Sequence, residues 1–400
     1  MPGEGVHFRV WAPKRKKAEV VLWEESPAFF EMRAEGNGYF EAVIPRASAG
    51  SVYKYRLDEG DWYPDPASRF QPRGPHHFSE VIDPSSFEWT DSDWRGVSMQ
   101  SQVLYEMHIG TFTPEGTFSA AESELLNLRN LGITAIEVMP IAEFPGEFGW
   151  GYDGVHPYAP TRLYGRPDDV RHFVDAAHGL GLAVILDVVY NHLGPHGNYL
   201  SAFSPYYFTS DHKTDWGEAI NYYAKHSGPV REFFIMNAGY WIAEFHFDGL
   251  RVDATHSIYD ESKEHLLSAM VQEVRRAGSP KSVVVIGENE PQDPRLVDQP
   301  EKGGYGLDAL WNDDIHHAAA VRLTGRKEAF LSDYSGTPQE FVSIAKYGFL
   351  FQGQRYRWQK KRRGGPARNL APQQFVNFLQ NHDQISNSAR GLRIHQRASP

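Results

Sequence analysis

Residues 245–253 read Phe-His-Phe-Asp-Gly-Leu-Arg-Val-Asp, a short apolar segment that ends in an arginine and a carboxylate two positions apart. In a β-strand, residues i and i+2 point to the same face, so Arg251 and Asp253 would point the same way at the carboxyl end of a strand. A guanidinium beside a carboxylate favours the ionised form of that carboxylate. Such a group suits the nucleophile of a covalent glycosyl-transfer reaction, although a structural Arg–Asp pair explains these two residues alone equally well.

Strands and helices alternate from about residue 100 onward. Expected strands begin near residues 103, 134, 182, 248, 282, 308 and 374, and expected helices cover residues 120–131, 168–181, 230–246 and 260–277. The segment Leu182–Val189 is almost continuously apolar, as strands buried on both faces are. The alternation predicts an α/β fold with a parallel sheet. Polar residues after the strands favour a (β/α)8 TIM-type barrel, and a doubly wound sheet is second because no Gly-x-Gly-x-x-Gly follows the first strand.

The first 95 residues follow a different pattern. Polar and apolar residues alternate in short runs, at residues 7–11, 18–23, 39–44 and 52–57, with turn residues between them. Period-2 alternation at this spacing predicts a small all-β, immunoglobulin-like sandwich. We therefore expect two domains, a β-sandwich over residues 1–95 and a catalytic barrel over residues 96–400.

Composition limits the classes of partner. The chain carries 40 basic and 51 acidic residues, a net charge of −11, which argues against nucleic acid or an anionic membrane as partner. No run approaches 18 apolar residues, and the amino terminus lacks the basic and apolar regions of a signal peptide. Cysteine is absent, which excludes disulfides and thiolate metal sites and fits a cytoplasmic protein.

Polar side chains follow four of the expected strands. In chain order they are Asp187, Asn191 and His192, then Arg251 and Asp253, then Glu288, and finally Asn381, His382 and Asp383. The carboxyl ends of barrel strands meet at one mouth, so we expect these side chains to converge there.

Two carboxylates in different protonation states are what glycoside hydrolysis requires. Asp253, beside an arginine, suits the nucleophile. Glu288 follows an apolar strand, where burial would favour protonation, and so suits the acid/base. Asp383 suits the stabilisation of positive charge on the sugar, and the histidines suit hydrogen bonds to hydroxyls. A lone histidine at a strand end is more often a core residue. The prediction therefore rests on the combination of three carboxylates, an arginine and two histidines at one mouth. No His-x-His or His-Glu-x-x-His motif occurs, and we expect no catalytic metal.

Four segments resemble, in order and spacing, the four sequence regions of the alpha-amylase family of glycoside hydrolases. They are residues 187–192, 249–253, 287–290 and 381–383. Residues 141–154, 306–314, 323–325, 348–354 and 377–384 resemble the branch of that family that releases trehalose from maltooligosyltrehalose. The amino-terminal sandwich is similar to the carbohydrate-module-like domain in front of the barrel in that branch.

The resemblance implies roles for individual residues. It implies that Asp253 is the nucleophile, Glu288 the acid/base and Asp383 the transition-state stabiliser. It implies substrate binding by Arg251, His192, His382, Tyr152, Asn191, Trp150 and Trp311, with Tyr152 stacked on the cleaved glucose. Trp150, Trp311, Phe144 and Phe148 are positional candidates for the leaving-group side. Retention of configuration is implied, with the Asp253 and Glu288 carboxyl groups about 5–5.5 Å apart. No cofactor is implied.

The implied reaction is hydrolysis of the alpha-1,4 bond next to the terminal trehalose of maltooligosyltrehalose. A separate synthase would make this substrate beforehand, and no physical complex between the two enzymes is implied. A branching or debranching enzyme of the same family is one alternative. An inactive glucan-binding remnant is another, because family members continue beyond the Asn-His-Asp region through an eighth strand, whereas this sequence ends at Pro400. We therefore expect an open barrel of seven strands with two unpaired edges and reduced stability.

Overall fold

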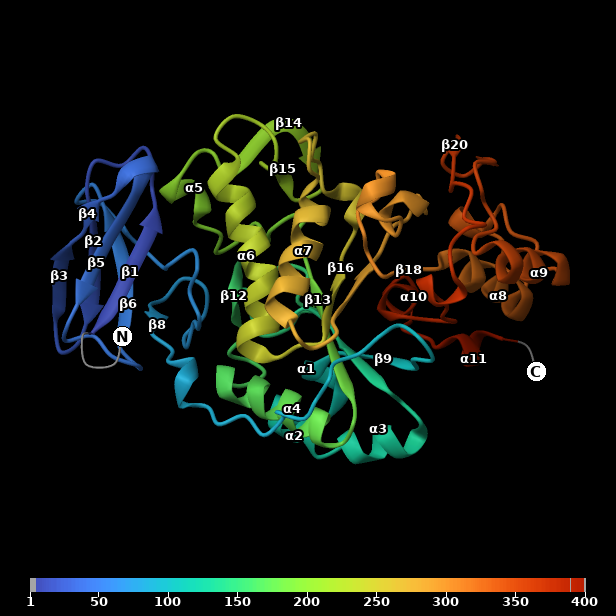
Figure 1. Cartoon of the computed structure of the whole chain (residues 1–400), viewed down its shortest axis with the longest axis horizontal. Helices are drawn as coiled ribbons and strands as arrows, with labels where there is room; N and C mark the ends of the chain where they lie inside the picture. Colours follow the sequence, from blue (N-terminus) through green and yellow to red (C-terminus); the bar gives the residue numbers. More distant parts are fainter. Residues whose placement is uncertain (1–4, 389, 399–400) are drawn as a thin grey trace.

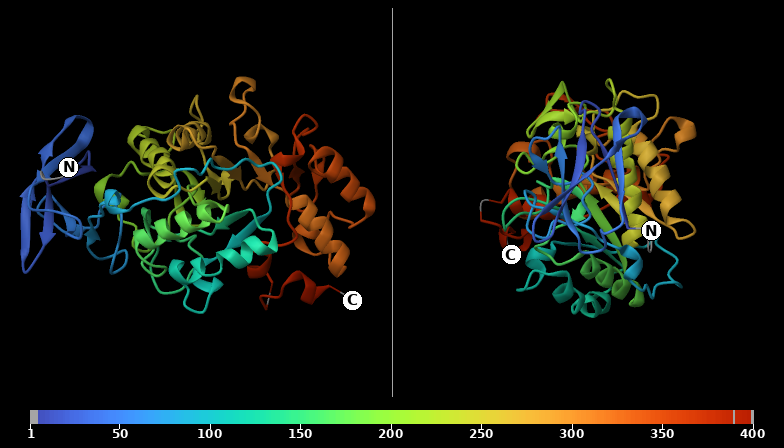
Figure 2. Two further views of the ribbon diagram at one scale, coloured as in Figure 1. Left: turned by 60° about the horizontal axis from the view of Figure 1, so that its bottom comes forward. Right: turned by 90° about the vertical axis from the view of Figure 1, so that its left-hand side faces the viewer.

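The computed structural model describes residues 5–388 and 390–398. Small β-sheets form one end of an elongated molecule, a curled sheet surrounded by helices forms the middle, and the last residues lie at the far end (Figure 1). The segment after the first sheets runs along the central part before it enters the parallel sheet (Figure 2).

Two antiparallel sheets form the amino-terminal part. One has the order β1-β5-β4, and the other has the order β3-β2-β6-β7 with β8 also paired to β6. Their strands are β1 (Val6–Trp11), β2 (Ala18–Trp23), β3 (Pro27–Glu31), β4 (Arg33–Ala34), β5 (Tyr39–Ile44), β6 (Val52–Leu57), β7 (Trp62–Tyr63) and β8 (Ser79–Glu80). The inward-facing rings pack together, with Phe8 edge-on to Tyr53 at 4.8 Å between ring centroids. The predicted sandwich is confirmed, whereas the domain boundary at residue 95 stays a prediction.

Seven parallel strands form the central sheet, in the order β21-β18-β17-β16-β13-β10-β9. They are β9 (Leu104–Met107), β10 (Ala135–Val138), β13 (Ala183–Val188), β16 (Gly249–Val252), β17 (Val284–Gly287), β18 (Ala309–Trp311) and β21 (Phe375–Val376). The predicted barrel-type sheet of seven strands is confirmed, with β9 and β21 at its two edges. A cavity of about 610 Å³ lies beside these edges, lined among others by Glu106, Glu137 and Phe378. The reduced stability expected from the unpaired edges stays a prediction.

Most of the main helices lie around this sheet, and the last two pack against each other at the end of the molecule that holds the last residues (Figure 1). The main helices are α2 (Phe118–Glu122), α3 (Leu125–Leu131), α4 (Pro167–Gly179), α6 (Gly228–Phe245), α7 (Leu266–Gly278), α8 (Asp313–Thr324) and α9 (Pro338–Tyr347). The single helix expected over residues 120–131 is two helices, because the chain bends at Ser123 and Glu124. The helix expected from residue 260 begins at Leu266, because the Asp260 carboxylate accepts hydrogen bonds from the backbone N–H groups of Ser262 and Leu266 and holds this segment as a loop.

Short elements complete the chain. They are α1 (Ile109–Phe112), α5 (Leu200–Phe203), α10 (His382–Ser386), α11 (Ile394–Arg397), β11 (Ala142–Glu143), β12 (His156–Pro160), β14 (Phe208–Thr214), β15 (Gly217–Ile220), β19 (Arg355–Tyr356) and β20 (Lys361–Arg362). The strand expected over residues 374–380 shortens to β21, after which the chain leaves the sheet. None of the helices in the described ranges is both long and apolar enough to span a bilayer.

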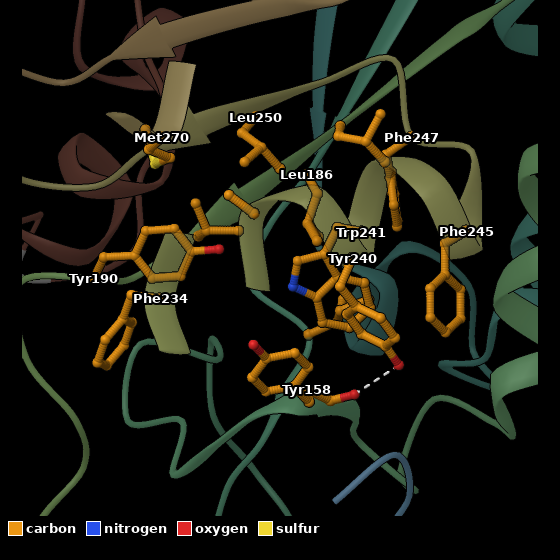
Figure 3. Packing of buried hydrophobic residues seen from close by; sticks show 14 of the residues in the cluster. Tyr158, Leu186, Tyr190, Phe234, Tyr240, Trp241, Phe245, Phe247, Leu250 and Met270 are labelled. Atoms are coloured by element: carbon orange, nitrogen blue, oxygen red, sulfur yellow. Dashed lines mark hydrogen bonds between the residues drawn. The ribbon is translucent and has the colours of Figure 1, made fainter. Parts of the chain in front are cut away.

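Helix α6 packs its aromatic residues against the central sheet (Figure 3). Trp241 is almost fully buried next to Leu186 of β13, and Phe234 packs edge-on against Tyr190, with 5.5 Å between ring centroids. Leu250 of β16 belongs to the same buried cluster. The Tyr240 hydroxyl donates a hydrogen bond to the Tyr158 carbonyl at 2.9 Å. Burial of each large side chain contributes about 2–3 kcal/mol, so this layer fixes the two strands from which the functional side chains project.

Candidate active site

The carboxyl ends of β13, β16 and β17 bring the predicted residues together. Asp187 and Arg251 are paired across the neighbouring strands β13 and β16, and Val252 pairs with Gly287 of β17. Asp253 directly follows Val252, and Glu288 directly follows Gly287. The expected convergence of the strand ends is therefore what the sheet register produces.

Arg251 holds three carboxylates with one guanidinium. Its Nη1 donates to Asp187 Oδ2 at 2.8 Å and to Asp253 Oδ1 at 2.9 Å, and its Nη2 donates to Glu288 Oε2 at 2.9 Å. The guanidinium is buried, and its carbon lies 4.1 Å from the centroid of the Trp311 ring. Buried charges of this kind require several partners, and here each carboxylate is one.

Asp253 and Glu288 are fixed but still reach solvent. Their side chains are 13% and 19% exposed. The second oxygen of Asp253, Oδ2, accepts a hydrogen bond from Asn191 Nδ2 at 2.8 Å. Glu288 Oε2 also accepts from the Ala254 N–H at 3.0 Å, and its Oε1 has no hydrogen-bond partner within the described residues. Oε1 is thus the atom free to exchange a proton with a bound molecule.

His192 lies on the other side of Asn191. Its Nε2 is 3.0 Å from the Tyr152 carbonyl oxygen, and its Nδ1 faces Asn191 Oδ1. Burial lowers the pKa of His192 and favours the neutral ring. Trp216, at the turn of the β14–β15 hairpin, stacks on His192 with centroids 3.7 Å apart, and its indole N–H donates to Asp153 Oδ1 at 3.0 Å.

Tyr152 links the two sides of the site. Its hydroxyl donates to Asp187 Oδ2 at 2.7 Å, and its ring stacks on His382 with centroids 5.0 Å apart and planes 26° apart. Burial raises the pKa of Asp187 to about 7, although the nearby Arg251 opposes this shift. Tyr152 therefore supplies a flat ring and a hydrogen bond to the innermost carboxylate.

Asp383 lies at the open end of the site, 47% exposed. Its Oδ1 is 3.8 Å from His382 Nε2, and partial desolvation by the surrounding groups raises its pKa, aided by the charge of Glu288. His382 is held by Glu106, which contacts Nδ1 at 2.6 Å and accepts the His382 backbone N–H at 2.8 Å. Burial alone would lower the pKa of His382, but the Glu106 contact outweighs it and the pKa is raised.

Two of the four candidates for the leaving-group side, Trp150 and Trp311, lie beside His382, with ring centroids 5.6 Å and 6.2 Å from the centroid of the His382 ring. Trp150 is partly exposed and meets His382 edge-on. Trp311 is buried beneath the arginine and Phe144 is buried in the core, so neither forms a surface at the mouth. Phe148 is 94% exposed in the same loop as Trp150.

Sequence reasoning missed Glu106, Glu137 and Trp216. Glu106 and Glu137 are neighbours across β9 and β10, and each is a single acidic residue within an otherwise apolar strand, which was the available signal. Burial raises the pKa of Glu137 to about 8. In residues 5–388 and 390–398, no three His, Asp or Glu side chains are grouped as metal ligands, and the metal-free reaction stays a prediction.

Comparisons with known proteins show the family to which the chain belongs. Residues 81–232 match the model of the alpha amylase catalytic domain, and residues 1–84 match carbohydrate-binding module 48, the isoamylase N-terminal domain. Malto-oligosyltrehalose trehalohydrolase from Saccharolobus solfataricus is 44% identical over 391 residues, which are 98% of this chain and 68% of that protein. The chain belongs to the malto-oligosyltrehalose trehalohydrolases of the alpha-amylase family.

Other trehalohydrolases and solved structures extend the match. The trehalohydrolase of Deinococcus radiodurans is 42% identical, and the match covers 98% of this chain and 64% of that protein. The chain therefore spans about two thirds of the length of these two relatives. The crystal structure of "Putative alpha Amylase from Salmonella typhimurium" has a TM-score of 0.92 at 41% identity, with 98% of this chain and 66% of that chain covered. A Bacillus subtilis pullulanase shares the fold, with a TM-score of 0.74 at 20% identity. The match covers 94% of this chain and 58% of that chain.

Proposed function

We propose that the chain hydrolyses the alpha-1,4 bond next to the terminal trehalose of maltooligosyltrehalose and releases trehalose. The trehalohydrolase relatives support the substrate. One observation supports the chemistry: a single buried guanidinium holds Asp253 and Glu288, each at 2.9 Å, so that both carboxyl groups face one small volume. The retaining mechanism that membership of the alpha-amylase family implies requires these two carboxyl groups to lie about 5–5.5 Å apart.

The reaction proceeds in two displacements. Glu288 donates its proton to the glycosidic oxygen while Asp253 attacks the anomeric carbon, so trehalose leaves and a glycosyl–aspartate ester forms. The ionised Glu288 then takes a proton from water, whose oxygen attacks the same carbon and displaces Asp253. Two inversions return the alpha configuration, and both side chains regain their initial protonation states.

The surrounding residues position the sugar. We assign Asp383 to the positive charge that develops on the ring, His382 and His192 to sugar hydroxyls, and the Tyr152 ring to the sugar face. Asn191 and Arg251 fix the orientation of Asp253. Trp150 and the exposed Phe148 remain candidates for the trehalose side. The substrate requires an earlier synthase that builds a chain ending in trehalose.

The branching-enzyme alternative has weaker support. The branching enzyme GlgB of Thermosynechococcus vestitus is 33% identical over 305 residues, only 64% of this chain and 39% of that protein. An inactive glucan-binding form is the alternative that the activity measurement separates from a hydrolase.

The test is incubation of the chain with maltotriosyltrehalose while free trehalose is measured. We expect release by the parent and by Asp93→Asn, an exposed matched control, and a loss of at least about 1,000-fold in Asp253→Asn, which lacks the nucleophile. Proton NMR should show the alpha anomer of maltotriose first. A folded parent that releases no trehalose, or the beta anomer appearing first, would contradict the proposal.

A further inference from the structure

A second cavity, of about 670 Å³, lies between the amino-terminal sheets and the central part of the chain. Trp11 and Tyr39 line it from β1 and β5, whereas Tyr206 and the start of α6 line it from the other side. The two sides are joined next to it, because the Arg15 guanidinium donates to the Ala202 carbonyl oxygen at 3.0 Å from Nε. The cavity is thus a fixed feature of the junction.

Aromatic rings form much of its wall. Tyr206 is partly exposed, and its centroid lies 4.2 Å from that of His226 and 6.4 Å from that of Trp11. The Tyr39 ring lines the opposite side, with the Arg9 guanidinium over one of its faces at 3.8 Å. Flat rings beside hydrogen-bonding groups match the two kinds of surface that a pyranose presents, its C–H face and its equatorial hydroxyls.

Several polar groups around these rings have no partner within the described residues. The Lys14 ammonium, 5.5 Å above the Tyr206 ring, forms no hydrogen bond or ion pair there. The Tyr206 hydroxyl, the His226 ring nitrogens and the Asn37 side-chain amide likewise have none. Helix α6 also begins here at Gly228, and its Ser227 cap makes no side-chain hydrogen bond. Donors and acceptors therefore surround a partly apolar wall without being satisfied by the protein.

The charges at the cavity offset each other. Lys14 is opposed by Glu232, which accepts a hydrogen bond from the Tyr39 hydroxyl at 3.4 Å. A phosphate or nucleic-acid ligand requires an excess of positive charge, whereas here one lysine is matched by one glutamate. A neutral polyhydroxylated ligand matches these features.

We propose that this junction is a second binding site for an alpha-glucan chain, separate from the candidate active site, with Tyr206 as the stacking ring and Lys14, Asn37 and His226 as hydrogen-bonding groups. Helix α6 follows the loop after β13, so its amino terminus lies at the end of the sheet where the strands carry the active site. A glucan held at the junction therefore lies at the same end of the molecule as the reaction, and long chains are retained there while their ends are processed. The proposal does not depend on the hydrolysis proposed above.

The test is native electrophoresis in gels that contain glycogen, with all variants made in the Asp253→Asn background so that no glucan is cleaved. Tyr206→Ala should weaken retardation by glycogen about tenfold, and Tyr206→Phe, which keeps the ring, by less than about threefold. Lys14→Ala should weaken it about threefold, whereas Lys16→Ala, an exposed lysine in the same turn, should match the parent. In the active background, Tyr206→Ala should hydrolyse maltotriosyltrehalose within about twofold of the parent rate.

Lys14 and Lys16 are both exposed, so their replacement does not disturb the core and their comparison stays informative even if Tyr206→Ala folds poorly. The proposal is overturned if Lys14→Ala and Lys16→Ala migrate alike in glycogen. It is also overturned if Tyr206→Phe loses as much retardation as Tyr206→Ala, since stacking is then not involved. Because retardation requires no turnover, an inactive chain that still binds glycogen through Tyr206 would refute only the proposed hydrolysis.

Discussion

Asn191 donates a hydrogen bond from Nδ2 to Asp253 Oδ2 at 2.8 Å. Arg251 occupies the other oxygen of the same carboxylate, so both oxygens of Asp253 have a partner and its orientation is fixed before substrate arrives. The Asn191 amide also donates to the Asp253 carbonyl at 3.0 Å, which ties the side chain to the end of the strand. Such preorganisation favours the transition state over the ground state.

Asn191→Ala should therefore lower kcat by about 100-fold with a change in KM of less than threefold, since a hydrogen bond to a charged group is worth about 1.5–3 kcal/mol. The measurement is steady-state trehalose release from maltotriosyltrehalose. Asn198→Ala, in the loop that follows, is the matched control and should retain the parent rate. A rise in KM with unchanged kcat would mean that Asn191 binds substrate rather than positioning Asp253.

Replacement of Arg251 by lysine should affect both activity and stability. A lysine ammonium cannot present two nitrogens to Asp253 and Glu288 at once, and Asp187 would also lose a partner. We expect Arg251→Lys to lower kcat/KM by at least about 1,000-fold and the free energy of unfolding by about 3 kcal/mol. Activity assays and urea denaturation test this. Arg275→Lys, at a half-exposed arginine, should change neither quantity, and an active Arg251→Lys would exclude the proposed bridge.

Glu137 predicts a pH dependence of stability. Burial raises its pKa in the folded state to about 8, from about 4.3 in an unfolded chain. Below pH 4 both states are protonated, whereas between pH 4.3 and 8 only the folded state keeps the proton, so this residue makes folding weaker as pH rises through that window. Glu137→Gln should remove this component, making the fall in unfolding free energy between pH 5 and pH 8 smaller by about 1 kcal/mol or more. An identical fall in parent and variant would show that Glu137 is ionised in the folded chain.

The residues at the strand ends of the candidate site were predictable because residues adjacent to them in the sequence are enough to identify them. Arg251 and Asp253 share a strand face by period-2 alternation alone, and Glu288 follows the next buried strand. The contact between Glu106 and His382 was not predictable in this way, since the two residues are separated by 276 positions. Only the closing of the strand ends into one mouth brings them together.

The β14–β15 hairpin was missed for a different reason. Its first strand contains Asp211, His212 and Lys213 in succession, so polar residues point to both faces and no alternation marks a strand. The hairpin nevertheless carries Trp216 onto the His192 ring. A surface hairpin with polar residues on both faces leaves little trace in sequence periodicity.

Asp91 predicts a second, opposite pH dependence. Its Oδ2 contacts Lys281 Nζ at 2.8 Å, His246 Nδ1 at 2.8 Å and His178 Nδ1 at 2.9 Å. Burial alone would raise its pKa, but these contacts outweigh burial and lower the pKa to about 2, so its stabilising contribution is complete above pH 4 and is lost as pH falls toward 2. Asp91→Asn should lower the free energy of unfolding at pH 7 by about 2 kcal/mol, less than for a fully enclosed pair because solvent screens the lysine. The difference from the parent should shrink at pH 3, whereas the exposed Asp93→Asn should match the parent at both values. A difference that stays constant between pH 7 and pH 3 would mean that Asp91 acts through packing and not through its charge.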